Sequence, residues 1–223
     1  MNKVETALEY ARSKHMGQKR KDGSPYIEHP IAVAEYLMDN GITAEEYIIT
    51  ALFHDLLEDT SATEDDILRI GGEDVLEAVK LLTKREGVSG DAYIKGILGN
   101  DIAKAVKNAD RIHNLREALT AAPDFVERYL KNTKEHYLGL FSEELDEAYE
   151  QLREYHENRY IYTLDTSCET LYRTEKATNK SWIFNPEMQK WIECDEYFWA
   201  ELGDDAKEIT PEEAKNFQIS FLP

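Results

Sequence analysis

A histidine and three carboxylates interrupt an otherwise apolar segment, ALFHDLLEDT, at residues 51–60. These four ionisable residues are His54, Asp55, Glu58 and Asp59. If the segment is helical, with 100° per residue, they fall on one arc of about 140°. The residues one turn earlier on that side are apolar, so the charged group does not continue a solvent-exposed stripe. Because burial of an unpaired charge is costly, the group needs an ion-pair partner or a metal ion.

Local ion pairing is not available to this group, because no lysine or arginine occurs between Lys21 and Arg69. An imidazole and a carboxylate at adjacent positions, His54 and Asp55, could both reach one ion. Mixed nitrogen and oxygen ligands suit divalent manganese, iron, zinc or magnesium. The alternative interpretation is a helix end that passes from buried to exposed, with the acids simply in water.

Two other segments could complete a metal site. The segment YIEHP places His29 at the start of a helix, and KNADRIHNL places Asp110 inside a helical run. Each is ambiguous alone, because His29 could cap its helix and Asp110 could pair with Lys107 or Arg111. Together with the first pair they supply two histidines and two carboxylates, which suffice for one metal ion with positions left for water and substrate. His113 could approach the same pocket, although we do not expect it to be a ligand.

The remaining two acids are candidates for proton transfer. Glu58 lies one helical turn after His54, and Asp59 one turn after Asp55, so we expect one rigid helix to position all four. A carboxylate at hydrogen-bond distance can take a proton from a metal-activated water. The basic cluster KRK at residues 19–21 is the densest positive patch of the chain. It could meet an anionic nucleotide, or it could be an exposed loop whose charge only aids solubility.

The elements that must position these residues are predominantly helical. Apolar residues recur with helical spacing through residues 1–160, which predicts a mostly α domain. After residue 160 the segments YIYTLDT, TLYRT, SWIFN and KWIEC are short and rich in β-branched and aromatic residues. Thr210 and Pro211 then indicate the start of a short helix. We therefore expect a small β-rich domain at residues 161–223, whose role the sequence does not indicate.

Composition limits the classes of function. The chain has 223 residues, is 42% apolar and carries a net charge of −19, which argues against a duplex nucleic acid partner. No apolar run approaches the roughly 18 residues of a membrane span, and the N-terminus does not resemble a signal peptide. The two cysteines, Cys168 and Cys194, are therefore expected as free thiols in a cytoplasmic protein.

The order H…HD…D of these residues resembles the HD phosphohydrolases. More specifically, RKDGSPYIEHP, HDLLEDT and NADRIHNLREAL resemble three successive motifs in the hydrolase domain of RelA/SpoT proteins. The same motifs occur in the single-domain small alarmone hydrolases, including the metazoan SpoT homologue. The resemblance covers roughly residues 1–160, and the remaining segment matches no family that we can name.

The resemblance implies an all-helical HD-domain hydrolase fold and removal of the 3′-pyrophosphate from ppGpp and pppGpp, which yields GDP or GTP and pyrophosphate. It implies one manganese ion bound by His29, His54, Asp55 and Asp110. It implies that Glu58 and Asp59 are the catalytic pair. It also implies nucleotide contacts from Arg20, Lys21, Asn114 and Tyr137.

Several alternatives share these residues. The same centre could act on ppApp, or on the 2′-phosphate of NADPH, and such an enzyme could serve as an antitoxin to an alarmone synthetase. A non-catalytic nucleotide sensor has no need of both Glu58 and Asp59, so it is disfavoured. Residues 161–223 could serve domain docking, oligomerisation or partner binding.

Overall fold

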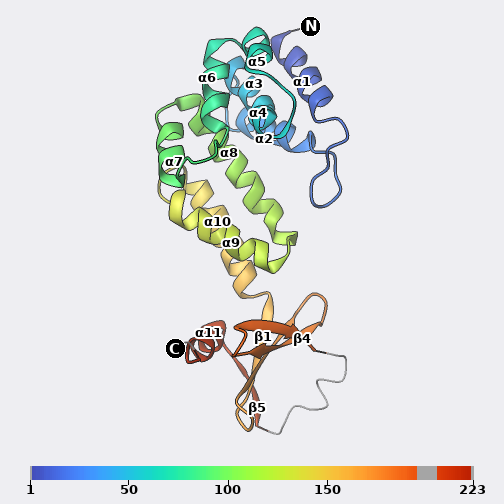
Figure 1. Cartoon of the computed structure of the whole chain (residues 1–223), viewed down its shortest axis with the longest axis vertical. Coiled ribbons are helices and arrows are strands. Elements are labelled where there is room, and N and C mark those ends of the chain that lie inside the picture. The colour runs from blue at the N-terminus through green and yellow to red at the C-terminus, as the bar shows by residue number, and fades with distance from the viewer. Residues whose placement is uncertain (1, 195–204, 222–223) are drawn as a thin grey trace. The chain divides into compact units, whose positions relative to one another are not determined.

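The computed structural model describes residues 2–194 and 205–221. It divides into two compact units, Met1–Glu150 and Gln151–Pro223 (Figure 1). The first unit is helical, and the second contains a five-stranded antiparallel sheet, so the expected fold class is confirmed. Among the described residues, no helix is long and apolar enough to cross a membrane.

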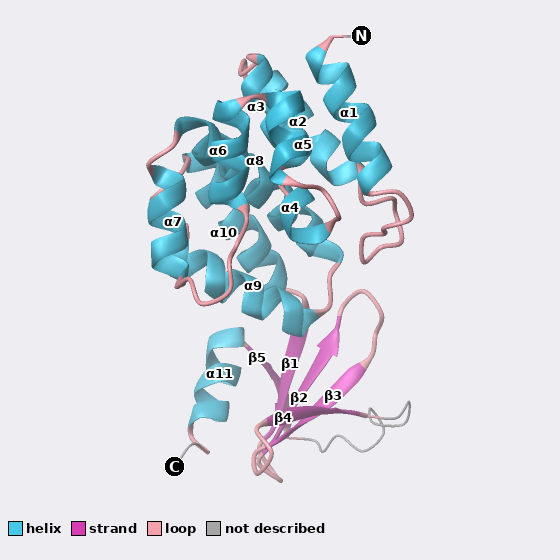
Figure 2. Ribbon diagram, turned by 45° about the horizontal axis from the view of Figure 1, so that its top comes forward, coloured by secondary structure: helices cyan, strands magenta, loops and turns pink. Residues whose placement is uncertain are grey.

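Several helices of the first unit pack around a central apolar helix, α3 (Glu45–Phe53). All six residues from Ile48 to Phe53 of this helix are buried, and it packs against α1, α2, α6 and α8 (Figure 2). The helices are α1 (Lys3–Lys14), α2 (Glu28–Asp39), α3 (Glu45–Phe53), α4 (Leu56–Asp59), α5 (Glu64–Gly71), α6 (Glu73–Leu82), α7 (Gly90–Leu98), α8 (Asp101–Glu117), the 3₁₀ turn η1 (Ala118–Thr120), α9 (Pro123–His136) and α10 (Glu143–Glu157). The last helix continues across the division between the units.

Side-chain caps fix where several helices begin. Asn2 forms a reciprocal capping box with Glu5 at α1, and Thr63 accepts a hydrogen bond from the backbone N–H of Asp66 at α5. Asn100 accepts from the backbone N–H of Ala103 at α8, which sets the register of the long helix that contains Asp110. These caps satisfy backbone donors that have no partner within the helix.

The prediction of one rigid helix through residues 54–59 is wrong. Helix α3 ends at Phe53, and a separate single turn, α4, begins at Leu56. The Nδ1 atom of His54 lies 2.7 Å from the carbonyl oxygen of Ala51. This contact occupies the carbonyl that an unbroken helix would offer to the backbone N–H of Asp55. The break therefore places His54 and Asp55 at a corner between the two helices.

The second unit contains the predicted β-rich segment. Its strands are β1 (Tyr160–Asp165), β2 (Thr170–Glu175), β3 (Ser181–Asn185), β4 (Lys190–Glu193) and β5 (Ala206–Ile209), arranged in the order β4-β3-β2-β1-β5. Helix α11 (Pro211–Ile219) begins with a Thr210–Glu213 capping box and has proline in its first turn. Its Ala214 packs with Leu171 and Phe184 in a small core on one face of the sheet.

Candidate active site

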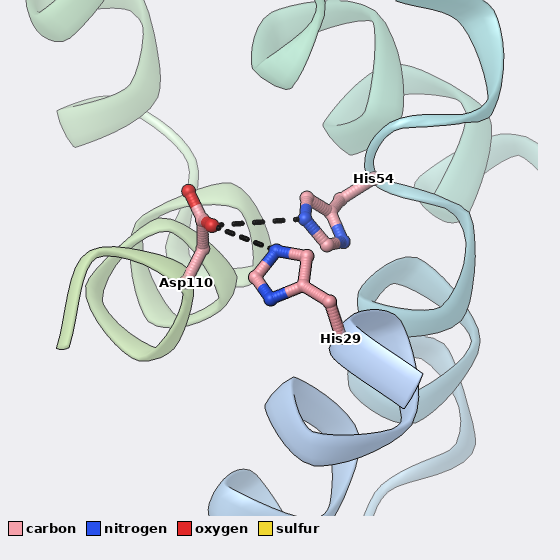
Figure 3. A group of neighbouring side chains, drawn as sticks. All are labelled: His29, His54 and Asp110. Atoms are coloured by element: carbon pink, nitrogen blue, oxygen red, sulfur yellow. Dashed lines mark ion pairs between the residues drawn. The ribbon is translucent and has the colours of Figure 1, made fainter. Parts of the chain in front are cut away.

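Three helices bring together the side chains expected to bind a metal. His29 lies in the first turn of α2, His54 follows the last residue of α3, and Asp110 lies within α8. One possible ligand atom from each of the three lies within 4.8 Å of the other two (Figure 3). Asp110 Oδ1 is 3.1 Å from His29 Nε2 and 3.8 Å from His54 Nε2. All three side chains are buried.

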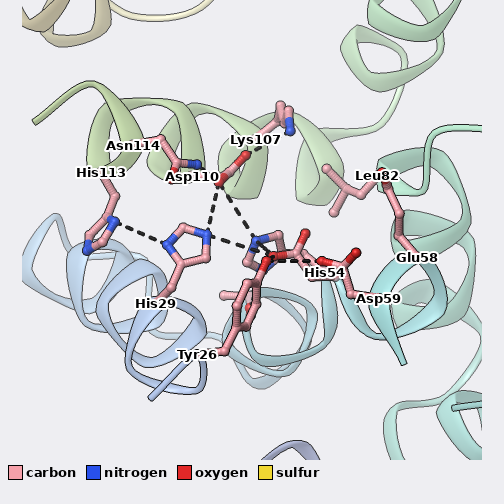
Figure 4. Close-up of polar contacts among 12 residues, drawn as sticks. Tyr26, His29, His54, Glu58, Asp59, Leu82, Lys107, Asp110, His113 and Asn114 are labelled. Carbon is pink, nitrogen blue, oxygen red and sulfur yellow. Dashed lines mark hydrogen bonds and ion pairs between the residues drawn. The ribbon is translucent and has the colours of Figure 1, made fainter. Parts of the chain in front are cut away.

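Asp55 lies beside this group of three. Its Oδ2 atom is 3.1 Å from His54 Nε2 and 3.9 Å from His29 Nε2. The same oxygen accepts a hydrogen bond of 2.7 Å from the hydroxyl of Tyr26, which also lies 3.1 Å from Asp59 Oδ2 (Figure 4). Tyr26 therefore connects a candidate metal ligand with one of the candidate catalytic acids.

The chemistry of this donor set fits a divalent cation. His54 Nε2 is buried and makes no aligned hydrogen bond with any residue that the structure describes, although it faces the carboxylates of Asp55 and Asp110. A buried imidazole nitrogen that has no hydrogen-bond partner is unusual. Two imidazoles with one or two carboxylates form a common ligand set for divalent transition metals.

The electrostatics of the site favour positive charge at its centre. Burial lowers the pKa of His54, but the carboxylates of Asp55 and Asp110 outweigh it and raise the pKa to about 9. Burial raises the pKa of Asp110, but Lys107 and the two imidazoles hold it well below its usual range. Burial also raises the pKa of Asp55, but His54 outweighs it and holds that pKa below its usual range. Both carboxylates therefore remain ionised and can attract a cation.

The candidate catalytic acids lie at the exposed edge of the same corner. Glu58 and Asp59 both belong to α4 and are exposed, in contrast to the buried histidines. Glu58 Oε2 accepts a hydrogen bond of 3.1 Å from the backbone N–H of Lys84. The two acids are therefore accessible to solvent, and α4 keeps them close to Asp55.

A polar cavity of about 330 Å³ opens over these residues. Its walls contain four carboxylates and four cationic side chains, so their charges balance within a chain of net charge −19. The acids are Asp55, Glu58, Asp59 and Asp110, and the cations are Arg20, Lys84, Lys107 and Arg111. A bound divalent ion would make this cavity positive and hence suitable for an anionic ligand.

Three of the four expected nucleotide contacts line the cavity, namely Arg20, Asn114 and Tyr137. Asn114 donates a hydrogen bond of 2.5 Å to Asp110 Oδ1 and accepts one of 2.9 Å from Arg20. The structure does not bring Lys21 to the cavity wall, because its ammonium lies 3.4 Å from the ring centre of Phe125 in α9.

A larger cavity of about 580 Å³ lies between α6 and α7. Its lining combines aliphatic residues such as Leu76 and Leu81 with charged ones such as Glu73 and Lys80, and it lacks the histidines and the acid pair. Size therefore does not identify the reactive cavity here, whereas the convergence of ligand atoms does.

The HD domain family profile matches residues 7–126, which include His29, His54, Asp55 and Asp110. The chain belongs to the HD domain family. The bifunctional (p)ppGpp synthase/hydrolase SpoT of Escherichia coli K12 is 34% identical to this chain over an alignment of 151 residues. The alignment covers 63% of this chain and 21% of SpoT. The guanosine-3′,5′-bis(diphosphate) 3′-pyrophosphohydrolase of Aquifex aeolicus is 36% identical over 145 residues, or 61% of this chain and 21% of that protein.

A solved structure extends these comparisons to the fold of the HD domain. It is a metazoan ortholog of SpoT that hydrolyzes ppGpp, matched with a TM-score of 0.54 and 28% identity over 68% of this chain and 96% of that chain. The resemblance inferred from the three motifs is thereby confirmed. The chain spans only about a fifth of the length of the curated relatives described above.

Two cationic side chains of the HD domain, Lys107 and Arg111, also line the cavity, although the sequence does not predict this role for them. Lys107 donates a hydrogen bond of 2.7 Å to Asp110 Oδ2. The guanidinium of Arg111 is 3.7 Å from the ring centre of Tyr137 and 4.6 Å from that of Tyr129. From the sequence, both cations are expected only as possible ion-pair partners of Asp110. Their spacing of four residues on α8 could have indicated a shared face that points into the site.

Proposed function

We propose that the chain is a metal-dependent pyrophosphohydrolase that removes the 3′-pyrophosphate of ppGpp and pppGpp. The observation that carries this proposal is the convergence of His29, His54 and Asp110 on one point beside Asp55 and an exposed acid pair. The pyrophosphohydrolase names of the relatives and the metazoan ppGpp hydrolase support the choice of substrate. We also propose a cytoplasmic location, which a purine nucleotide substrate of this kind favours.

In this proposal, His29, His54, Asp55 and Asp110 hold one divalent ion, which we propose to be Mn²⁺. A bound ion of this kind lowers the pKa of coordinated water and neutralises charge on a phosphoryl oxygen. The mixed imidazole and carboxylate ligands are compatible with manganese.

Glu58 and Asp59 would orient the attacking water and accept its proton. The water oxygen forms a bond to the phosphorus that is attached to the 3′-oxygen, and the bond between that phosphorus and the 3′-oxygen breaks. The 3′-oxygen leaves with a proton as the ribose hydroxyl, and pyrophosphate contains the oxygen of the water. Tyr26 would hold Asp59 in place through its hydroxyl.

The cationic walls of the cavity would bind the phosphates. Lys107 and Arg111 extend from α8 next to Asp110, and Lys84 lies on the opposite segment after α6. Arg20 would contact the nucleotide at the cavity edge, where its planar guanidinium can stack on a purine or pair with a phosphate.

A three-substrate assay tests the proposal. Metal-stripped protein would be reloaded with Mn²⁺ and given ppGpp, ppApp or NADPH, and pyrophosphate and phosphate release would be measured separately. We expect rapid pyrophosphate release from ppGpp, none without metal, and much slower turnover of the other two. Faster release from ppApp or phosphate release from NADPH would reassign the substrate. Absence of turnover with any of them would contradict the enzyme assignment.

A further inference from the structure

A chain of polar contacts connects a candidate metal ligand to the mouth of the cavity. Behind the site, His29 Nδ1 lies 3.1 Å from His113 Nδ1 (Figure 4). The other nitrogen of His113, Nε2, is 3.6 Å from Glu117 Oε1. The second oxygen of Glu117 is paired with Arg20. Glu117 thus contacts both His113 and Arg20, although it does not itself line the cavity.

The hydrogen positions along this chain follow from the role of His29. If His29 binds metal through Nε2, its Nδ1 carries the hydrogen and donates it to Nδ1 of His113. A neutral His113 must then carry its own hydrogen on Nε2, which faces Glu117. At 3.6 Å this last contact is electrostatic attraction rather than a hydrogen bond. A carboxylate at this position favours the tautomer of His113 that His29 requires.

The two metal-binding histidines are therefore supported differently. His54 Nδ1 lies 2.7 Å from the carbonyl oxygen of Ala51, a main-chain support that no side-chain substitution removes. His29 relies on the side chains of His113 and Glu117. Supporting groups of this kind orient a ligand and raise its basicity, and their loss typically weakens metal affinity about 10–100-fold.

At the other end of this series of polar contacts, Glu117 positions Arg20, which lines the cavity. Arg20 donates both to Glu117 and, over 2.9 Å, to the amide oxygen of Asn114. These contacts direct its guanidinium toward α8 and leave it only 16% exposed. Without Glu117, Asn114 would be its one remaining hydrogen-bond partner among the described residues, and the side chain could turn into solvent.

We propose that Glu117 is a positioning residue shared by the metal and nucleotide halves of the site. Its carboxylate holds His113, and through it His29, while also holding Arg20 at the cavity mouth. The nucleotide half of this inference rests on the proposed function, whereas the metal half does not. Removal of Glu117 must therefore weaken metal binding and substrate binding together, although the side chain touches neither ligand.

The test compares three variants of the full chain. Glu117→Ala removes both contacts, and alanine is well tolerated in a helix. Arg20→Ala removes only the nucleotide end. Glu144→Ala is the matched control, because Glu144 also accepts hydrogen bonds from two side chains, Tyr36 and Arg116, but lies away from the cavity. Circular dichroism and thermal unfolding would establish that each variant is folded.

The measurements are the dissociation constant of Mn²⁺ for metal-stripped protein, by calorimetry, and KM and kcat for ppGpp at saturating Mn²⁺. We expect Glu117→Ala to raise the Mn²⁺ dissociation constant about tenfold and to raise KM severalfold. We expect Arg20→Ala to raise KM alone, and Glu144→Ala to change neither quantity.

The proposal is overturned if Glu117→Ala leaves the Mn²⁺ dissociation constant within about twofold of the wild-type value. It is also overturned if Glu117→Ala weakens Mn²⁺ binding but leaves KM unchanged. Wild-type protein that binds Mn²⁺ without hydrolysing ppGpp would refute the proposed function instead. In that case binding of ppGpp to the Mn²⁺-loaded protein, measured by calorimetry, replaces KM, and failure to bind refutes the shared role of Glu117.

Discussion

At the residue scale, the proposed metal ligands and the proposed catalytic acids differ in burial. His29, His54 and Asp110 are buried, so their positions are fixed by packing and their charges are poorly screened. Glu58 and Asp59 are exposed and can exchange protons with water. This division explains why these five residues and Asp55 can share one corner without destabilising the core, because the buried members pair with one another or with a cation.

The acid pair gives the first prediction. Glu58→Gln and Asp59→Asn keep the shape of each side chain but remove its ability to accept a proton. We expect each to lower kcat by at least about 100-fold while the Mn²⁺ dissociation constant and the unfolding temperature remain close to wild type. Pyrophosphate release measured across a range of ppGpp concentrations provides the check. A variant with wild-type kcat would show that its carboxylate has no role in proton transfer.

Tyr26 gives the second prediction. Burial, followed by Asp55 and Asp59, raises the pKa of its phenol far above its ordinary value, so the hydroxyl stays protonated and acts as a donor. Tyr26→Phe removes the donor but keeps the ring, whose centre lies 4.8 Å from that of His15. Because hydrogen bonds to charged groups are among the stronger ones, we expect kcat to fall about tenfold.

Comparison of Tyr26→Phe with Asp59→Asn in a double-mutant cycle isolates the role of the hydroxyl. If Tyr26 acts through Asp59, the second substitution adds little to the effect of the first. Fully multiplicative effects would show that the hydroxyl acts elsewhere.

At the element scale, local sequence patterns can indicate where a helix begins, whereas a contact made by His54 decides where one helix ends. The caps at Thr63 and Thr210 each join residues only three positions apart, so they are predictable from the sequence. The break after Phe53 depends on the side chain of His54 turning back to Ala51, which no periodicity reveals. Gly90 and Gly96 weaken the helical pattern of α7 in the sequence.

Only one of the two glycines of α7 discussed above has a structural reason that becomes visible in three dimensions. A Cβ atom at Gly90 would lie 2.8 Å from the ring of His136, and one at Gly96 would lie 3.4 Å from the side chain of Leu81. Close approach to α9 therefore explains Gly90, whereas Gly96 would meet only an ordinary contact. Strand β5 was missed for a related reason, since AKEI has a charged pattern that pairing with β1 overrides.

A contact between three helices gives the third prediction. Glu144 of α10 accepts hydrogen bonds from Tyr36 of α2, at 2.5 Å, and from Arg116 of α8, at 2.6 Å. The hydrogen bond from Tyr36, followed by that from Arg116, lowers the pKa of Glu144 below its ordinary value of 4.5. The ionised carboxylate thus stabilises the folded state at pH values above 4.5, and this contribution is lost as the pH falls through the lowered pKa.

We expect Glu144→Gln to lower the free energy of unfolding at pH 7 by about 1 kcal/mol or less, because the side chain is partly exposed. The difference between variant and wild type should shrink as the pH falls below 4.5. Urea unfolding at several pH values measures it. A difference that stays constant or grows toward acidic pH would contradict the charge-based explanation.

At the scale of the whole molecule, the sequence indicated most residues of the candidate site but not the side-chain contacts between them. Three motifs predicted which residues converge, because each motif is local and their order matches a known family. The pairing of Arg20 with Glu117 joins positions far apart in the chain, and nothing in either segment specifies the partner. Lys21 shows the converse, since the family resemblance implies a nucleotide contact for it, whereas in the structure its ammonium lies over the ring of Phe125.

The separate roles that we propose for the two parts of the chain give the fourth prediction. We propose that residues 1–160 form the hydrolase domain and that residues 161–223 are accessory. All residues that line the reactive cavity lie at or before Tyr137. The match to the metazoan ppGpp hydrolase covers 96% of that protein but only 68% of this chain. Little of that protein therefore remains to correspond to the sheet.

A chain ending after Asn158 retains the whole of α10, which ends at Glu157, and loses every strand of the sheet. We expect it to fold and to keep kcat/KM for ppGpp within about threefold of the full chain, because separate compact units tolerate division between them. Size-exclusion chromatography and calorimetric Mn²⁺ binding distinguish a misfolded fragment from an inactive one. A folded fragment that binds Mn²⁺ normally but has lost most of its turnover would show that the sheet participates in catalysis. In that event, an assignment of function from the helical unit alone would be incomplete.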